Sequence, residues 1–216
     1  MKTMFFSIDT IVDEDKIPIL APKVKGPAAM LKGYSDQPEF EYSHLPEAVR
    51  IIGIHMAGND LAPSTNWGNK SAEAELLTLF WKWAERATKI VGFGCSYFDL
   101  PVILIRSAAL GIEPTQKFFE FKPWDNILID IADRRYGRQY QGRLSLNTLR
   151  SLLLPLLDIP SASQLDYEDV VKKYKAGEDL APYATLKIET IRALAKLWGS
   201  YFFPRVLRRP GGPDEP

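Results

Sequence analysis

The segment that most constrains the fold is an apolar run of strand length near the start of the sequence, residues 4–12 (MFFSIDTIV). Two polar residues, Ser7 and Asp9, interrupt it at alternate positions. Because successive side chains of a strand point to opposite faces, we expect this hydroxyl and this carboxylate to face one common space. The pattern raises the question of an active site; polar residues at the end of an ordinary strand are the alternative.

Length and composition favour one α/β domain. The 216 residues are 46% hydrophobic and 25% charged, which is ordinary for a globular protein of this size. We predict a single domain over residues 1–203, with a loop excursion at 12–37 that is rich in Lys, Asp, Pro and Gly, and a Pro/Gly tail at 204–216.

Charge and cysteine content narrow the class of protein. Lys+Arg and Asp+Glu each count 27, so the net charge of zero does not indicate nucleic-acid binding, which would need locally clustered charge. The single cysteine, Cys95, excludes an internal disulfide and fits a reducing compartment. No stretch approaches the roughly 18 apolar residues of a membrane-spanning helix and no signal peptide is evident, so we expect a cytoplasmic protein without membrane contact.

The order of elements predicts a central mixed sheet flanked by helices. Hydrophobic patterning indicates strands at 3–11, 39–43, 49–58 and 89–94, and a strand running into a helix at 126–137. A turn is expected at 66–71. Helices are expected at 72–88, capped by Ser71, then up to Gly111, from Ser145 to Pro155, at 166–177, and from about Asp179 onward.

Three collinear segments resemble a known family. They are FFSIDTIVD (5–13), the stretch that contains FDLPVILIRSAALGI (98–112), and YEDVVKKYKAGEDLAPYATLKIETI (167–191). These segments look like the predicted 3′–5′ exonucleases related to the proofreading domain of family-B DNA polymerases. The resemblance implies membership of the DEDD exonuclease superfamily, with a ribonuclease-H-like fold.

The resemblance also implies a metal-dependent chemistry. In such nucleases two divalent metals about 4 Å apart activate a water and stabilise the leaving oxygen of the phosphodiester. Four acidic side chains supply the hard oxygen ligands that Mg²⁺ requires. The family places two acids on the first strand as D-x-E, one in the second motif and one on the last helix as Y-x-x-x-D, where the tyrosine positions the attacking water.

Carried over residue by residue, the family's acids are only half retained. Ser7 stands where the family has aspartate, and Asp9 where it has glutamate. Asp99 matches the second-motif acid, although it also precedes Leu-Pro and can instead cap a helix. Tyr183 matches the final tyrosine, with a core aromatic as the alternative, but Lys187 replaces the acid four residues on.

We therefore expect a degenerate site. Lys187 falls on the predicted buried stripe of the last helix and needs a carboxylate partner, for which Asp9 and Asp99 are the candidates. We predict that its ammonium takes the place of a metal. Asp9 and Asp99 would then bind metal weakly if at all, and Mg or Mn would act as cofactor only if some activity remains.

Several other chemically capable residues have ordinary explanations. Asp130 matches a frequent family acid before a helix, or is a helix cap. His44 and His55 match no catalytic position of the family, so a metal or acid–base role for either is not expected. Cys95 has no histidine placed to activate it, and we interpret it as structural.

A nucleic-acid surface is predicted from interleaved arginine and tyrosine, a combination suited to backbone contact and base stacking on single strands. Tyr97 and Phe98, beside the second motif, are candidates for stacking on a terminal base. A solvated loop and helix surface is the alternative. The basic segment and a weaker patch in the tail contain Arg134, Arg135, Tyr136, Arg138, Tyr140, Arg143, Arg150, Arg205, Arg208 and Arg209.

The sequence thus predicts an exonuclease-type domain that has lost catalysis and binds single-stranded or 3′-ended nucleic acid, or that serves as a structural subunit with a protein partner in a nucleic-acid complex. Two alternatives remain open. One is a weakly active metal-dependent 3′–5′ exonuclease, and the other is a protein-interaction scaffold that does not bind nucleic acid.

Overall fold

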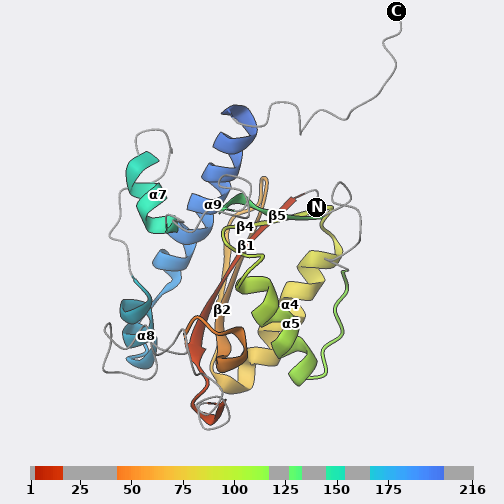
Figure 1. Cartoon of the computed structure of the whole chain (residues 1–216), viewed down its shortest axis with the longest axis vertical. Coiled ribbons are helices and arrows are strands. Elements are labelled where there is room, and N and C mark those ends of the chain that lie inside the picture. Colours follow the sequence, from red (N-terminus) through yellow and green to blue (C-terminus); the bar gives the residue numbers. More distant parts are fainter. Residues whose placement is uncertain (1–2, 17–42, 117–126, 133–144, 154–165, 202–216) are drawn as a thin grey trace, which may run out of the picture.

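The structure is a computed structural model that describes residues 3–16, 43–116, 127–132, 145–153 and 166–201. Helices lie on both faces of a five-stranded mixed sheet with the strand order β3-β2-β1-β4-β5 (Figure 1). The strands are β1 (Thr3–Val12), β2 (Val49–Gly58), β3 (Ser64–Trp67), β4 (Lys89–Gly92) and β5 (Leu128–Asp130). The α-helices are α4 (Glu73–Glu85), α5 (Asp99–Ala109), α7 (Leu146–Leu153), α8 (Tyr167–Lys175) and α9 (Ala181–Tyr201).

The central strand β1 has neighbours of both directions. It pairs antiparallel with β2, where Ser7 lies opposite His55 and Asp9 opposite Gly53, and parallel with β4. The β1–β4 pairing covers only the first residues of β1, and among the described residues no strand pairs with the second half of β1 on that side. Parallel β5 and antiparallel β3 form the two edges of the sheet.

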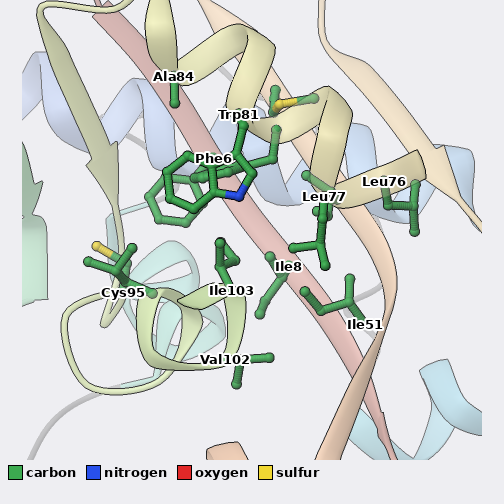
Figure 2. Close-up of a cluster of buried hydrophobic side chains, with 14 of the residues drawn as sticks. Phe6, Ile8, Ile51, Leu76, Leu77, Trp81, Ala84, Cys95, Val102 and Ile103 are labelled. Carbon is green, nitrogen blue, oxygen red and sulfur yellow. The ribbon is translucent and has the colours of Figure 1, made fainter. Parts of the chain in front are cut away.

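The alternation of β1 side chains builds two cores. Met4, Phe6 and Ile8 pack with α4 and α5 on one face, in the core cluster that also contains Trp81 (Figure 2), and the Phe6 ring lies 5.4 Å from the Phe80 ring. Phe5 packs on the other face with apolar residues of α9. Ser7 and Asp9 share the face of Phe5, as their spacing predicted, and so β1 directs both polar side chains toward the side that α9 covers.

Most helix boundaries follow the predicted signals. The Ser145 hydroxyl accepts a hydrogen bond from the Thr148 N–H (3.1 Å) at the start of α7, and the Asp179 carboxylate accepts one from the Ala181 N–H (2.9 Å) at the start of α9. Gly177 follows α8 with a positive φ of 71°, a backbone conformation in which glycine is not strained.

The prediction for residues 66–71 was wrong in part. Asn66 and Trp67 belong to the edge strand β3, which is too short to show an alternating pattern. The cap is Asn69 rather than Ser71: the Asn69 side chain accepts hydrogen bonds from the backbone of Ser71 and Ala72 and starts the 3-10 helix η3 (Lys70–Ala72). The following helix α4 is shorter than the predicted range 72–88 at both ends.

A buried ion cluster, here called the Arg106 cluster, joins the residue after β1 to α4 and α5. Arg106 donates to both carboxylate oxygens of Glu73 (2.9 and 2.6 Å) and contacts Asp13 at 3.4 Å. Glu73 also accepts the backbone N–H of Ile51 on β2 (2.7 Å). Glu73 lies in the first turn of α4, where the helix dipole favours an acid, and it is also buried as the partner of an arginine.

Other predicted features are described only in part. The excursion at 12–37 is described as far as the 3-10 helix η1 (Glu14–Lys16), and a further 3-10 helix, η2 (Pro46–Ala48), precedes β2. The predicted strand at 39–43, apart from its last residue, and the tail at 204–216 lie outside the described residues. Across the part of the chain that is described, no helix combines the length and the apolar character needed to cross a bilayer.

Candidate functional site

A pocket of about 490 Å³ opens on the α9 side of the sheet. It lies between β1, the first turn of α5, and the helices α7, α8 and α9. Four of the predicted site residues line it: Asp9, Asp99, Tyr183 and Lys187. The predicted fifth residue, Ser7, lies on the same face of β1 but is 3% exposed and is not among the lining residues.

Asp9 is the centre of a hydrogen-bond network that engages both of its carboxylate oxygens. Oδ1 accepts from the Lys187 ammonium at 2.7 Å and from the Tyr183 hydroxyl at 3.2 Å. Oδ2 accepts from His55 Nε2 at 2.7 Å. These donors come from α9 and β2, so the Asp9 carboxylate ties three elements of the fold together; we call Asp9, Lys187, Tyr183 and His55 the Asp9 network.

The charge on Asp9 is stabilised by its partners. Burial alone raises the pKa of the Asp9 carboxyl, but the Lys187 charge and the His55 hydrogen bond outweigh it and hold the pKa below its usual value. Burial likewise disfavours the charged form of Lys187, yet the nearby Asp9 raises the pKa of this ammonium above its ordinary value. Lys187 also donates to the Ile8 carbonyl at 2.8 Å, and both groups of the pair are therefore ionised.

Tyr183 joins the network through its hydroxyl while its ring stays half-buried. Burial is the largest cause that raises the pKa of Tyr183 to about 12, so the phenol remains protonated and donates to Asp9. The Lys187 ammonium lies 5.7 Å from the centroid of the same ring. The tyrosine thus supports the ion pair from the pocket side.

His55 is a member of the network that sequence reasoning missed. Its ring is fully buried, 4.7 Å from the Trp67 ring, and burial lowers the pKa of His55, so the imidazole is neutral. Because ionised Asp9 only accepts, Nε2 carries the proton, and Nδ1 has no hydrogen-bond partner among the described residues.

The position of His55 depends on the glycine two residues earlier. A Cβ built on Gly53 would lie 2.9 Å from two atoms of the His55 ring and 3.0 Å from Trp67. The missing side chain therefore leaves the space in which the imidazole reaches Asp9. The one sequence signal for this contact is the pairing of β1 with β2, whose register the sequence alone does not fix.

Asp99 lies in the first turn of α5 and does not cap the helix. The preceding residue, Phe98, holds the cap position and makes no side-chain capping bond, so the capping alternative for Asp99 is wrong. Burial, reinforced by the negative charges of Asp9 and Asp130 and opposed by Lys187, raises the pKa of the Asp99 carboxyl to about 7. A hydrogen bond with the backbone of Ile8, beyond the part of β1 that pairs with β4, acts in the opposite direction on this pKa.

Asp130 positions the loop that leads to Asp99. Its carboxylate accepts the backbone N–H groups of Gly94 (2.8 Å) and Ser96 (2.9 Å), and that of Ala132 (3.0 Å) as a helix cap. This arrangement includes the capping role predicted as one alternative. Gly94 adopts a positive φ of 68° in this loop, and Cys95 is fully buried in the apolar core, in agreement with its structural interpretation.

The predicted nucleic-acid residues fall into three groups. Tyr97 is 48% exposed beside the pocket, and Phe98 is half-buried and lines it. Arg150, from α7, also lines the pocket and is only 4% exposed, so it is not part of a solvated surface. The remaining residues lie outside the described part of the chain: Arg134, Arg135, Tyr136, Arg138, Tyr140, Arg143, Arg205, Arg208 and Arg209.

The donor set at this site fits a pair of divalent cations poorly. Within the described ranges, no group of three or more His, Cys, Asp or Glu side chains could hold a metal ion. Two Mg²⁺ ions need several anionic oxygens, whereas Asp9 already accepts from three protein donors and has an ammonium at 2.7 Å. The arrangement instead offers a cation, hydroxyl groups and a carboxyl group of raised pKa to a pocket ligand.

Comparison of folds relates the chain to a polymerase. The family B DNA polymerase from the hyperthermophilic archaeon Pyrobaculum calidifontis has a similar structure, with a TM-score of 0.56 over 91% of this chain and 11% sequence identity. The likeness covers 24% of the polymerase, so the chain spans about a quarter of its length. At this identity the likeness shows the fold alone, a ribonuclease-H-like α/β fold. A search by sequence finds no match among curated proteins.

A family model described as "predicted 3′-5′ exonuclease related to the exonuclease domain of PolB" matches residues 43–181. The matched region runs from before β2 to the first residue of α9 and includes Asp99, while Asp9 and Lys187 lie outside it. Because the match covers more than half of the chain, the protein belongs to the family of predicted 3′–5′ exonucleases related to the exonuclease domain of PolB.

Proposed function

We propose that this chain is a family member that has lost catalysis and binds single-stranded or 3′-ended nucleic acid, alone or as a structural subunit of a nucleic-acid complex. The observation that supports the proposal most is the Asp9 network. The carboxylate that a nuclease would use for metal binding is held by Lys187, Tyr183 and His55.

Electrostatics gives the reason. Phosphodiester hydrolysis in such enzymes depends on concentrated positive charge from two divalent ions, and four carboxylates normally hold these ions. Lys187 contributes a single positive charge and lowers the negative potential that would attract divalent metal. The pocket has the volume of a small-molecule site, and the aromatic ring of Phe98 lines it. Its capacity to bind metal is lower than that of a site with four carboxylates.

A weakly active exonuclease is the second candidate. One observation favours it: Asp9, Asp99 and Tyr183, the family's remaining acid and tyrosine positions, line the same pocket. Such an enzyme would need Asp9 to exchange protein donors for Mg²⁺ or Mn²⁺, which costs the hydrogen bonds of a buried ion pair.

A degradation assay separates the two candidate functions. It uses a 3′-labelled single-stranded oligonucleotide, in DNA and RNA forms, in the presence of Mn²⁺. Mn²⁺ is the lenient choice because it binds nitrogen and oxygen ligands more tightly than Mg²⁺ does. We expect no cleavage by the wild-type protein and salt-sensitive binding of the same oligonucleotide. The controls are Asp99→Ala and, for the same change at an exposed acid, Asp60→Ala.

Cleavage by the wild-type and Asp60→Ala proteins, but not by Asp99→Ala, would show an active enzyme and overturn the proposal. Absence of both cleavage and binding would also overturn it, in favour of a protein-interaction scaffold. Cleavage that appears only when Ser7→Asp and Lys187→Asp are combined would show that these two positions disarm the site.

A further inference from the structure

We propose that the outer face of α5 packs against the same face of a second copy of this chain, so that the protein forms a symmetric dimer. The proposal goes beyond the proposed function, because it depends neither on nucleic acid nor on the pocket. We call this surface the α5 face. Its residues are all apolar, exposed or half-buried, and they are Pro101, Leu104, Ile105, Ala108, Ala109 and Leu110.

No charged side chain of α5 is exposed. Of the two ionisable residues of this helix, Asp99 lines the pocket and Arg106 is buried in its ion pair with Glu73. Ile105 is instead 37% exposed, and Leu110, at the end of the helix, is 42% exposed. A helix on the surface of a protein normally carries polar residues on the side that faces water. An exposed apolar face without charge is typical of the centre of an interface.

The chemistry of the α5 face favours a protein as its partner. Nucleic acid is bound largely through cations that contact its phosphates, and α5 exposes none. A helix that lies on a membrane surface carries lysine or arginine along its polar side, whereas the one arginine of α5 is buried against Glu73. The small side chains of Ala108 and Ala109 allow the axis of a second helix to come close.

Charge favours a second copy of the chain as that protein. Basic and acidic residues each number 27, so the formal net charge is zero and two copies do not repel one another over a distance. The helix α4 lies beside α5 (Figure 1), and Trp81 of α4 donates to the Ser107 hydroxyl of α5 at 2.9 Å. A two-fold axis brings identical surfaces together, so the surroundings of the α5 face must carry both signs of charge to pair with themselves. The exposed charges of α4 and its end meet this condition; they are Glu75, Lys82, Glu85 and Arg86.

The size of the α5 face sets the expected affinity. The helix has 11 residues and is therefore about 16 Å long. A stable interface buries about 800 Å² on each partner, over about 20–30 residues. One short helix supplies less than this area, so the exposed side of α4 has to contribute as well. We expect a weak dimer, with a Kd of roughly 10–100 µM.

Sedimentation equilibrium of the full chain, at concentrations from about 5 to 500 µM, tests the proposal. We expect the weight-average mass to rise with concentration from 24.4 kDa toward twice this value. Ile105→Glu and Leu110→Glu each place two unpaired charges in the symmetric interface. Each should therefore raise the Kd by about tenfold or more and keep the protein largely monomeric.

Leu61→Glu is the matched control, because Leu61 is also exposed (52%) but lies in the loop between β2 and β3. Its carbonyl accepts a hydrogen bond from Arg192 of α9, on the other side of the sheet from α5. The same change at this position should leave the dependence of mass on concentration as in wild type. Thermal melting of each variant at low concentration shows whether it is folded; if one of the two α5 variants does not fold, the other decides.

Loss of the dimer in the α5 variants and its retention in Leu61→Glu would support the proposal. A wild-type protein that stays monomeric up to about 500 µM would overturn it. A dimer that Leu61→Glu dissociates and the α5 variants do not would place the interface elsewhere and would also overturn it. A monomer that binds a different protein in an Ile105-dependent way would assign the α5 face to another partner and exclude the second copy.

Discussion

Two buried clusters of charged side chains lie on opposite faces of the same sheet, and they differ in whether their side chains line the pocket. The Arg106 cluster joins a guanidinium to Glu73 and Asp13 beneath α4 and α5. The Asp9 network joins a carboxylate to Lys187, Tyr183 and His55 beneath α9. In both, burial opposes the charged form and an opposite charge restores it, so that the pKa of Arg106 is raised and that of Asp9 is lowered.

Access to the pocket separates the two clusters. None of the three residues of the Arg106 cluster lines the pocket, whereas Asp9, Tyr183 and Lys187 all do. A buried, paired cluster of charges therefore contributes to the stability of the fold. Such a cluster can also bind a ligand only if some of its side chains line the pocket. We expect changes in the first cluster to alter stability alone, and changes in the second to alter both stability and binding.

The largest effect is expected from Arg106→Met. This change leaves the buried Glu73 carboxylate without its charge partner, which typically costs about 3–5 kcal/mol of unfolding free energy. Urea denaturation measures the loss, and the affinity of the folded protein for a single-stranded oligonucleotide should not change. A loss below about 1 kcal/mol, or weakened binding in folded protein, would remove the distinction between the clusters.

Lys187→Met is expected to lower the free energy of unfolding by about 1.5–3 kcal/mol, because Asp9 loses a charged hydrogen-bond donor and keeps only uncharged ones. It should also abolish most binding of a single-stranded oligonucleotide. Adding Asp9→Asn removes the uncompensated charge and should recover much of the stability without recovering binding. Urea denaturation and anisotropy on the single and double variants measure both effects; recovery of binding in the double variant would contradict the role of the ammonium.

Asp99→Asn is expected to stabilise the protein at pH 8 and not at pH 4. The pKa of Asp99 is raised from 3.8 to about 7, so between these values the unfolded chain releases a proton that the folded protein keeps. Stability is therefore lost as pH rises from about 4 through 7. Partial exposure reduces the effect to roughly 1–2 kcal/mol at pH 8. Melting curves at both pH values check this, with Asp60→Asn as the matched change; equal effects at both would contradict it.

Gly53→Ala should produce the smallest change, about 1 kcal/mol of destabilisation, because the new methyl group displaces the His55 ring. The NMR signal of the His55 Nε2–H proton should shift as its hydrogen bond to Asp9 lengthens. In the His55→Ala background the same glycine change should cost less. Equal costs in both backgrounds would mean that Gly53 does not position the imidazole.

The sequence predicted the fold well because the signals were local. Alternation along β1 placed Ser7 and Asp9 on one face, and Ser145 and Gly177 marked helix boundaries. The strand β3 was missed because its four half-buried residues carry no alternation. A carboxylate partner for Lys187, either Asp9 or Asp99, was predicted from the family resemblance together with the buried stripe of the last helix, and in the structure Lys187 pairs with Asp9.

The rest of the site depends on tertiary structure. His55 reaches Asp9 through a strand register that no local signal specifies. Arg150 belongs to a segment whose composition indicated a surface, yet the packing of α7 buries this one arginine against the pocket. The predicted metal ligation by Asp9 and Asp99 and the loss of catalysis remain predictions.

The most direct test of the central claim is a Mn²⁺ titration followed by the EPR signal of free Mn²⁺, on wild-type protein, Asp9→Ala, and the Ser7→Asp/Lys187→Asp double variant. If Lys187 takes the place of a metal, wild type and Asp9→Ala should leave Mn²⁺ free at submillimolar concentration, and the double variant should bind it. Tight Mn²⁺ binding by the wild-type protein that is lost in Asp9→Ala would contradict the account.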